Sequence, residues 1–158
     1  MSKKVAVFPG SFDPFTIGHA QIVEKALELF DEVIIFMADN PNKKRMFDKR
    51  ATFNDIQYRY IDLMKEGRVS VSIEEGTVAD VAKLHNAKHI VKGIRNATDA
   101  DYEIAQSYAN KWIGDLQTIL IPTDKEYSHV SSTLVRSLLN SQGFNKEENM
   151  KKANELIY

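Results

Sequence analysis

Hydrophobic residues fall along the chain in short apolar runs and in longer segments where they recur every three or four positions. Short apolar runs are typical of buried strands, and the longer spacing is typical of amphipathic helices. The short runs predict five strands, at residues 5–8, 33–37, 69–73, 89–91 and 118–121. The helical spacing predicts helices at residues 18–30, 51–65, 78–84, 102–112, 131–139 and 146–156. Thr77, with Asp80 three residues later, has the character of a helix N-cap.

The predicted strands and helices alternate, which indicates the α/β class. Strands joined through helices run parallel, and these crossovers are right-handed in nearly all known proteins. We therefore expect a doubly wound, Rossmann-like sheet of about five parallel strands, formed by residues 1–158 as a single domain. Ligands of such sheets bind beyond the carboxyl ends of the strands, so we looked for chemistry in the loops that follow them.

Composition supports this picture and excludes several kinds of site. A chain of 158 residues suits one domain, and 43% hydrophobic with 27% charged residues is ordinary for a globular protein. The chain has no cysteine, which excludes disulfides, thiolate metal sites and cysteine nucleophiles. A net charge of −1 argues against a nucleic-acid partner, although a neutral sum can hide a locally charged site.

The N-terminus carries no visible targeting signal. Only four apolar residues separate Lys4 from Pro9, too few for a signal-peptide core or a membrane span. We therefore expect a cytoplasmic protein with no membrane partner.

The loop after the first predicted strand, residues 9–19, contains Gly10 and Ser11 and ends with His19 on the first turn of a helix. It has neither the Gly-Lys-Ser/Thr of a P-loop nor the Gly-x-Gly-x-x-Gly of a dinucleotide site. A helix N-terminus nevertheless offers free N–H groups to a phosphate, and His19 there is placed to donate a hydrogen bond. The alternative is a tight turn with a surface histidine.

The loop after the fifth predicted strand contains three consecutive hydroxyl residues, Ser131, Ser132 and Thr133. Hydroxyls at the start of a helix cap it and can also line an anion site. N-capping alone is therefore the alternative to a binding role.

Together the two loops resemble those of a nucleotidyltransferase superfamily that pairs a His-x-Gly-His loop with a Ser-Ser-Thr-x-x-Arg-like segment. Residues 16–19 read Thr-Ile-Gly-His, and residues 131–136 read Ser-Ser-Thr-Leu-Val-Arg. Within this superfamily the chain is most similar to the bacterial phosphopantetheine adenylyltransferases, which have Thr at the position of Thr16. The resemblance covers about residues 3 to 145, and its further matching segments are residues 9–14, 42–47, 92–95, 102–103 and 127–133.

The resemblance implies a nucleotidyltransferase fold and transfer of the adenylyl group of ATP to 4′-phosphopantetheine, giving dephospho-coenzyme A and pyrophosphate. The acceptor phosphate is already anionic, so in-line attack without a covalent intermediate depends on positioning and charge stabilisation. The resemblance also implies Mg²⁺ as cofactor, a homohexamer, and coenzyme A as a feedback ligand. No protein ligand for Mg²⁺ is assigned, because phosphates and water usually hold this ion.

Site residues follow from the resemblance position by position. Catalytic roles are implied for His19, Lys43, Ser11 and Arg95. ATP-binding roles are implied for Ser11, Phe12, His19, Gly93, Ile94, Arg95, Glu103, Tyr127, Ser128, His129, Val130, Ser131, Ser132 and Thr133. Contacts with the acceptor are implied for Ser11, Lys43, Val78 and Lys92.

Other interpretations of these residues stay open. Lys43 lies in a basic run with Lys44 and Arg45, and such runs are usually solvated surface. Glu103 can also be a simple partner for a basic residue. Three aromatic residues of the predicted helix at 102–112 suit the core or subunit contacts better than base stacking: Tyr102, Tyr108 and Trp112.

Lys92 departs from the family, which usually has arginine at this position. Lysine keeps the charge but loses the two-pronged hydrogen bonding of a guanidinium.

A close alternative function is transfer to another phosphate acceptor, as in a nicotinate mononucleotide adenylyltransferase or a cytidylyltransferase. Three features argue against it: Thr16, Lys43 and residues 92–95. A non-enzymatic receiver module needs paired acids after the first strand, where this chain has Pro9 and Gly10. The remaining histidines, His85, His89 and His129, lack the spacing of metal ligands.

Overall fold

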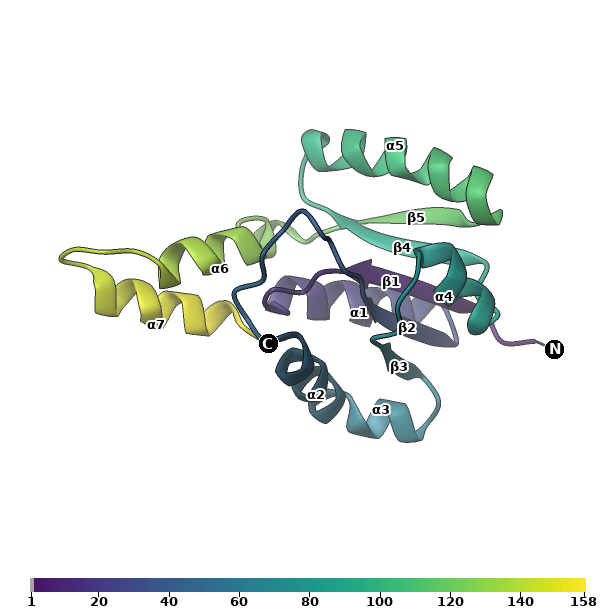
Figure 1. Ribbon diagram of the computed structural model, residues 1–158, viewed down its shortest axis with the longest axis horizontal. Coiled ribbons are helices and arrows are strands. Elements are labelled where there is room, and N and C mark those ends of the chain that lie inside the picture. The colour runs from purple at the N-terminus through teal and green to yellow at the C-terminus, as the bar shows by residue number, and fades with distance from the viewer. Residues whose placement is uncertain (1) are drawn as a thin grey trace.

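Five parallel strands form one sheet in the computed structural model, which describes residues 2–158. Their order across the sheet is β3–β2–β1–β4–β5, so the chain winds outward from β1 to both edges. The predicted α/β class and doubly wound five-stranded sheet are confirmed (Figure 1). The strands are β1 (Val5–Gly10), β2 (Glu32–Met37), β3 (Val69–Ser72), β4 (His89–Ile94) and β5 (Gln117–Pro122).

Helices cover both faces of the sheet (Figure 1). One face carries α1 (Ile17–Leu29), α2 (Lys49–Arg59) and α3 (Ile61–Lys65). The other carries α4 (Val78–Leu84) and α5 (Ala97–Gly114). A short 3-10 helix η1 (Lys125–Tyr127) follows β5, and α6 (Ser132–Leu139) and α7 (Lys146–Leu156) then project from the sheet as a hairpin.

Alternation along the central strands divides the apolar side chains between two cores. In β1, Ala6 and Phe8 pack in the core under α1, whereas Val5 and Val7 pack in the core under α4. All four side chains are buried. The central strands are therefore held from both faces, which fixes the position of the loops at their carboxyl ends.

Two of these strands are longer than predicted. β1 continues through Pro9 and Gly10, which pair with β2, so the expected stop at residue 8 is too early. β4 runs to Ile94 and pairs with β5 along its whole length, which makes residues 92–94 part of the sheet. Both extensions place predicted loop residues on the rigid sheet.

The single helix predicted over residues 51–65 is wrong: α2 and α3 are separated at Tyr60, whose backbone (φ −107°, ψ 16°) leaves the helical conformation. The Tyr60 side chain is only 6% exposed and packs against the rings of Phe15 and Tyr158. These partners are distant in the sequence, so helical spacing alone does not reveal the break.

α5 begins at Ala97 rather than at residue 102, because the Asn96 side chain caps it by accepting the N–H of Asp99. No residue of this helix is buried. Its aromatic side chains are 63%, 72% and 89% exposed at Tyr102, Tyr108 and Trp112. A place for them in the core is therefore wrong for this chain, and the alternative of subunit contacts stays a prediction.

Within residues 2–158, no helix combines the length and the apolar character that crossing a membrane requires.

Candidate active site

Two clefts open where the strands end at their carboxyl edge. The first has a volume of about 370 Å³ and lies between the β1–α1 loop, the end of β4 and the start of α6. The second has a volume of about 440 Å³ and extends from the same place between α4 and α5. The clefts share six lining residues: Pro9, Gly10, Ser11, Lys43, Lys92 and Glu103.

The structure brings most of the predicted site residues to these clefts. The first cleft is lined by Ser11, Phe12, His19, Lys43, Lys92, Gly93, Arg95, Glu103, Val130, Ser131, Ser132 and Thr133. Val78, for which a contact with the acceptor was predicted, lines the second cleft. Four predicted ATP-binding residues line neither cleft: Ile94, Tyr127, Ser128 and His129. Their roles stay predictions.

His19 is held by a reciprocal cap at the start of α1. The Thr16 N–H donates to His19 Nδ1 at 2.9 Å, and the Thr16 hydroxyl accepts the N–H of His19 at 3.3 Å. Because Nδ1 is an acceptor in this cap, the ring proton of neutral His19 lies on Nε2. The sequence pattern Thr-Ile-Gly-His thus produces a histidine with one assigned donor nitrogen.

The surroundings of His19 keep its ring uncharged. The rings of Phe12 and Phe15 lie 5.0 Å and 5.3 Å away between centroids. Burial, and after it the charges of Lys92 and Arg95, lower the pKa of His19 from 6.5 to about 3. His19 is therefore a neutral hydrogen-bond donor near pH 7 rather than a cation or a base.

The glycine of the β1–α1 loop serves the packing around this histidine. A Cβ on Gly10 would lie 2.8 Å from the Phe12 ring, so only glycine leaves room for that ring. Phe12 itself is 2% exposed and has φ 48°, in the left-handed region that costs energy for a bulky residue. Packing against the Phe12 ring therefore requires glycine at this position.

Arg95, at the end of β4, is oriented by Asp99 of α5. Its Nε donates to Asp99 Oδ2 at 2.9 Å, and its Nη2 donates to Oδ1 at 3.3 Å. Burial would raise the pKa of Asp99, but the hydrogen bonds and the charge of Arg95 outweigh it and hold that pKa below its usual value. Asp99 was not predicted as a site residue; its position four residues after Arg95, at a helix start, was the available signal.

Lys92 and Glu103 form an ion pair where the two clefts meet, with Lys92 Nζ 3.3 Å from Glu103 Oε1. Glu103 therefore pairs with a basic residue and also lines the first cleft, and its ATP-binding role stays a prediction.

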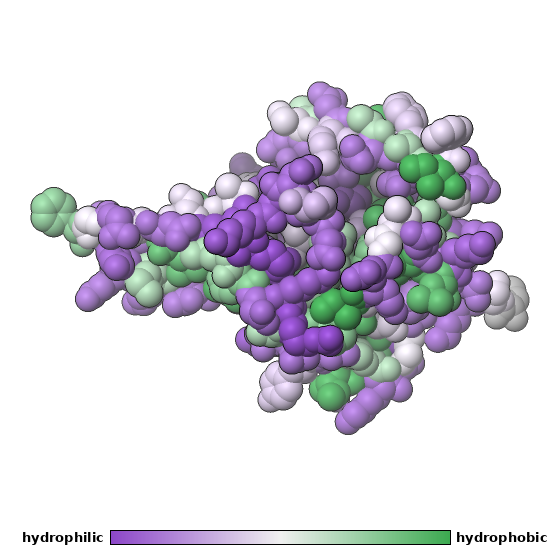
Figure 2. Space-filling model, viewed as in Figure 1, coloured by the Kyte–Doolittle hydropathy of each residue, from purple (hydrophilic) through white to green (hydrophobic). Residues whose placement is uncertain are grey.

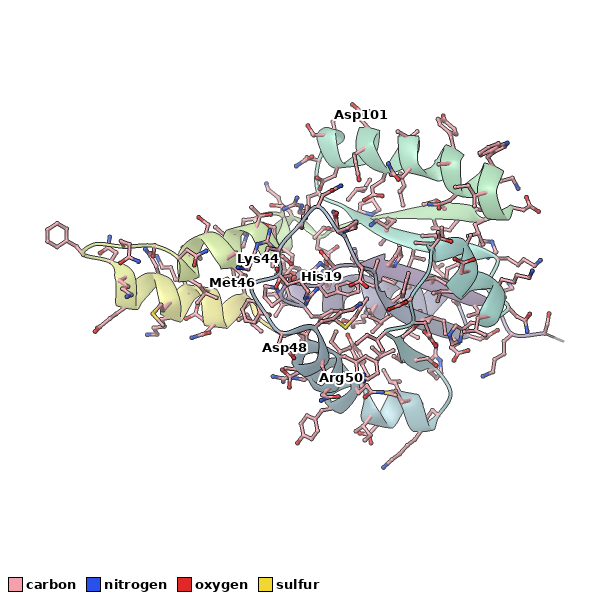
Figure 3. All side chains as sticks on the ribbon, viewed as in Figure 1. His19, Lys44, Met46, Asp48, Arg50 and Asp101 are labelled. Carbon is pink, nitrogen blue, oxygen red and sulfur yellow. The ribbon has the colours of Figure 1, made fainter. Side chains whose placement is uncertain are left out.

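Asp13 and Arg45 join the β1–α1 loop to the loop between β2 and α2, and neither was predicted as a site residue. The Asp13 carboxylate is buried and accepts the N–H groups of Met46 and Phe47, at 3.0 Å and 2.8 Å. Arg45 donates to the carbonyl oxygens of Ser11 and Phe12. Figure 3 labels Lys44 and Met46 on this loop between β2 and α2.

Lys43 lies two residues before Arg45 in the basic run and is exposed. Lys43 lines both clefts, so the interpretation of the whole run as free solvated surface is incomplete. Strongly hydrophilic side chains cover this part of the molecule in Figure 2, over the loop that Figure 1 draws in dark blue.

The three hydroxyl residues at the start of α6 are engaged in local contacts. Ser131 Oγ accepts the N–H of Leu134 as N-cap, and Ser132 Oγ donates to Pro14 O at 2.7 Å. Thr133 Oγ1 accepts from Arg136. N-capping is thus present together with a position on the first cleft, and the helix N-terminus faces the space where Arg95 lies.

Among residues 2–158, no three His, Cys, Asp or Glu side chains are grouped as a metal cage requires. The donors at the cleft are cations, hydroxyls, backbone N–H groups and one neutral imidazole. Such a set stabilises negative charge on phosphoryl oxygens and has no nucleophile activated by a base. The geometry therefore favours transfer between phosphates.

Comparison with known proteins agrees with this chemistry. A model of the cytidylyltransferase-like family matches residues 7–138. A solved nicotinic acid mononucleotide adenylyltransferase of Plasmodium falciparum, complexed with NaAD, superposes with a TM-score of 0.69 over 99% of this chain and 91% of its own, at 15% sequence identity. A lipopolysaccharide core biosynthesis protein of Thermoplasma volcanium has a TM-score of 0.53 over 78% of this chain and 98% of its own, at 19% identity. The fold and the site thus define a nucleotidyltransferase of the cytidylyltransferase-like class.

Sequence relatives narrow the class to a family. The chain is 36% identical over 137 residues to the phosphopantetheine adenylyltransferase of Thermotoga neapolitana, covering 85% of this chain and 82% of the relative. It is 40% identical over 136 residues to that of Cytophaga hutchinsonii, covering 85% of this chain and 89% of the relative. The chain belongs to the phosphopantetheine adenylyltransferase family, which confirms the resemblance found from its motifs.

The lowered pKa of His19 predicts a dependence of stability on pH. Below 6.5 the unfolded chain binds a proton on His19 that the folded chain refuses until about pH 3, so acidification favours unfolding. Relative to a His19→Gln variant, the wild-type chain should lose up to about 2 kcal/mol of unfolding free energy between about pH 7 and pH 5. Urea titrations of both proteins at the two pH values measure this difference. Parallel loss of stability in the two proteins would show that His19 is not held neutral.

Proposed function

We propose that this chain transfers the adenylyl group of ATP to 4′-phosphopantetheine, forming dephospho-coenzyme A and pyrophosphate. The observation that carries the proposal is the meeting of two clefts at Ser11, Lys43, Lys92 and Glu103, with His19 in the first cleft. A transferase needs its donor and its acceptor phosphate side by side, and these shared residues form a wall that is common to the two clefts. The phosphopantetheine adenylyltransferase relatives support the choice of substrates.

The donor takes the first cleft in this proposal. The triphosphate lies against the start of α6 and Arg95, whose guanidinium is fixed by Asp99. Adenosine lies toward Glu103 and Gly93. A Cβ on Gly93 would meet the Ile22 side chain at 2.8 Å, so glycine at this position allows α1 to pack closely against β4.

The acceptor takes the second cleft, with its phosphate at the common wall and its pantetheine arm toward Val78. This space has polar as well as apolar lining, including Ser107, Asn110 and Thr118. Ser107 and Asn110 offer a hydroxyl and an amide group on the wall formed by α5. An amide-rich arm such as pantetheine supplies partners of this kind.

The reaction is one in-line displacement. An oxygen of the acceptor phosphate forms a bond to the α-phosphorus of ATP, the bond from that phosphorus to the α–β bridging oxygen breaks, and pyrophosphate leaves with the electron pair. The acceptor is anionic near pH 7, so no side chain has to remove a proton. Lys43 brings the two reacting phosphates together, and Ser11 binds beside them.

His19 stabilises the transition state by donating from Nε2 to an oxygen on the α-phosphorus. A neutral donor, fixed before the substrate arrives, gains strength as that oxygen becomes more negative and requires no reorganisation. Catalysis then comes from positioning and from charge stabilisation together.

Mg²⁺ belongs to this proposal as a phosphate-bound ion. The donor set fits an ion held by substrate oxygens and water, because the carboxylates nearest the first cleft, Asp99 and Glu103, are paired with Arg95 and Lys92. When bound, the ion neutralises charge on the leaving pyrophosphate.

Transfer to another phosphate acceptor is the second candidate, favoured by the similarity in fold to the nicotinic acid mononucleotide adenylyltransferase. At 15% identity this likeness concerns the fold alone. Lys92 bears on which acceptor is used, because lysine binds a phosphate without the two-pronged geometry of arginine.

An acceptor panel tests the proposed reaction. With ATP and Mg²⁺, the purified protein should release pyrophosphate when 4′-phosphopantetheine is added, and should release little with nicotinate mononucleotide or with dephosphorylated pantetheine. His19→Ala should keep the fold and lose at least about 100-fold in kcat, the cost of removing one transition-state donor. Turnover with nicotinate mononucleotide instead of 4′-phosphopantetheine would overturn the assignment, and full activity of His19→Ala would overturn the role of its imidazole.

Assembly into a homohexamer, feedback binding of coenzyme A in the same clefts and a cytoplasmic location complete the proposal. The first has support in the exposed aromatic face of α5, which isolated soluble chains seldom leave uncovered. Sedimentation velocity should give the mass of six chains for the wild type and a smaller species for Trp112→Glu, because a charge at a buried subunit contact is costly. A monomeric wild type would remove hexamer formation from the proposal, and a hexameric variant would move the contact away from α5.

A further inference from the structure

The last two described residues return to the loop that carries the catalytic histidine. Ile157 forms an antiparallel bridge with Thr16, and the Tyr158 N–H donates to Phe15 O at 3.1 Å. Figure 1 shows how this happens: α6 and α7 leave the sheet as a hairpin, and α7 brings the chain back to the centre of the molecule. These two residues, Ile157 and Tyr158, form a tail that pairs with the backbone immediately before α1.

The Tyr158 ring continues this contact through side chains. Its centroid lies 5.9 Å from that of Phe15 and 5.7 Å from that of Tyr60, and the Arg59 guanidinium lies 5.5 Å from it, over the ring. The Phe15 ring in turn lies 5.3 Å from the His19 ring. A continuous row of rings therefore connects Tyr158 to His19.

Phe15 and Thr16, the two residues that the tail contacts, are the ones that hold the histidine. Thr16 caps α1 and donates its N–H to His19 Nδ1, and Phe15 packs against the imidazole. The tail itself lines neither substrate cleft; it borders a separate cavity of about 80 Å³ with Pro14 and Phe47. Any effect of the tail on the reaction must therefore pass through this loop.

We propose that Tyr158 is a positioning residue for His19: its backbone N–H and its ring hold Phe15 and Thr16 in the conformation that directs the imidazole Nε2 into the first cleft. The role rests on the proposed function, because it concerns the donor to the α-phosphorus. The rival explanation is that the tail only adds stability to the fold. That explanation predicts a lower unfolding temperature with unchanged kinetic constants for the folded fraction.

The kinetic test compares Tyr158→Ala with Tyr158→Phe and with a control on the same hairpin, Phe144→Ala, whose side chain is fully exposed. Tyr158→Ala should lower kcat about tenfold, since small misplacement of a catalytic group is costly, and should leave the KM for ATP within about twofold. Tyr158→Phe keeps the ring and the backbone bond and should restore kcat. Phe144→Ala should match the wild type. If Tyr158→Ala does not fold, Tyr158→Leu takes its place.

Hydrogen exchange gives a readout that does not depend on turnover. The amides of residues 16–19 should exchange faster in Tyr158→Ala than in the wild type, whereas Phe144→Ala should leave them unchanged. Unchanged kcat, a rise in KM alone, or unchanged exchange at this loop would each overturn the positioning role. A wild-type protein inactive with 4′-phosphopantetheine would instead count against the proposed function, and the exchange measurement would still decide the role of the tail.

Discussion

The hydrogen bond from the Thr16 N–H to His19 Nδ1 is the contact on which the chemistry of this site depends. It uses one ring nitrogen as an acceptor, so the other becomes the donor that faces the cleft. The surrounding phenylalanine rings and the cations of β4 keep the imidazole uncharged. A helix cap, which in most proteins serves only local stability, here sets the tautomer of the histidine to which we assign the catalytic role.

The cationic side chains around this histidine are also held in place by contacts within the protein. Arg95 is oriented by Asp99 and Lys92 is paired with Glu103, so each cation has a carboxylate partner before any phosphate arrives. The net charge of −1 hides this local arrangement. In the proposed function, phosphoryl groups bind to cations whose geometry is already set, which reduces the entropy lost when the substrates are ordered.

Much of the fold could be predicted because it depends on local sequence patterns, namely hydrophobic periodicity and helix capping. The five strands and the alternation of strands with helices follow from periodicity, and the cap formed by Thr77 and Asp80 is present as expected. The break at Tyr60 could not be predicted in this way, because the burial of its ring depends on Phe15 and Tyr158. Helical spacing describes one segment and contains no information about partners far along the chain.

The site residues likewise divide into those that sequence motifs predict and those that only the folded structure reveals. His19, Lys43 and Arg95 were found from motifs, and the structure brings them to one cleft. Asp13, Arg45 and Asp99 were missed as site residues because they act on other protein groups, and only the folded backbone shows those groups. Ile94 was predicted as an ATP-binding residue but does not line the cleft, although Lys92, Gly93 and Arg95 around it do.

The protonation state of the His19 ring is the most direct test of this account. Nitrogen NMR of the ¹⁵N-labelled protein should show a proton on Nε2 and none on Nδ1, with no change between about pH 8 and about pH 5. A ring protonated on Nδ1, or one that gains a second proton near its ordinary pKa of 6.5, would contradict it.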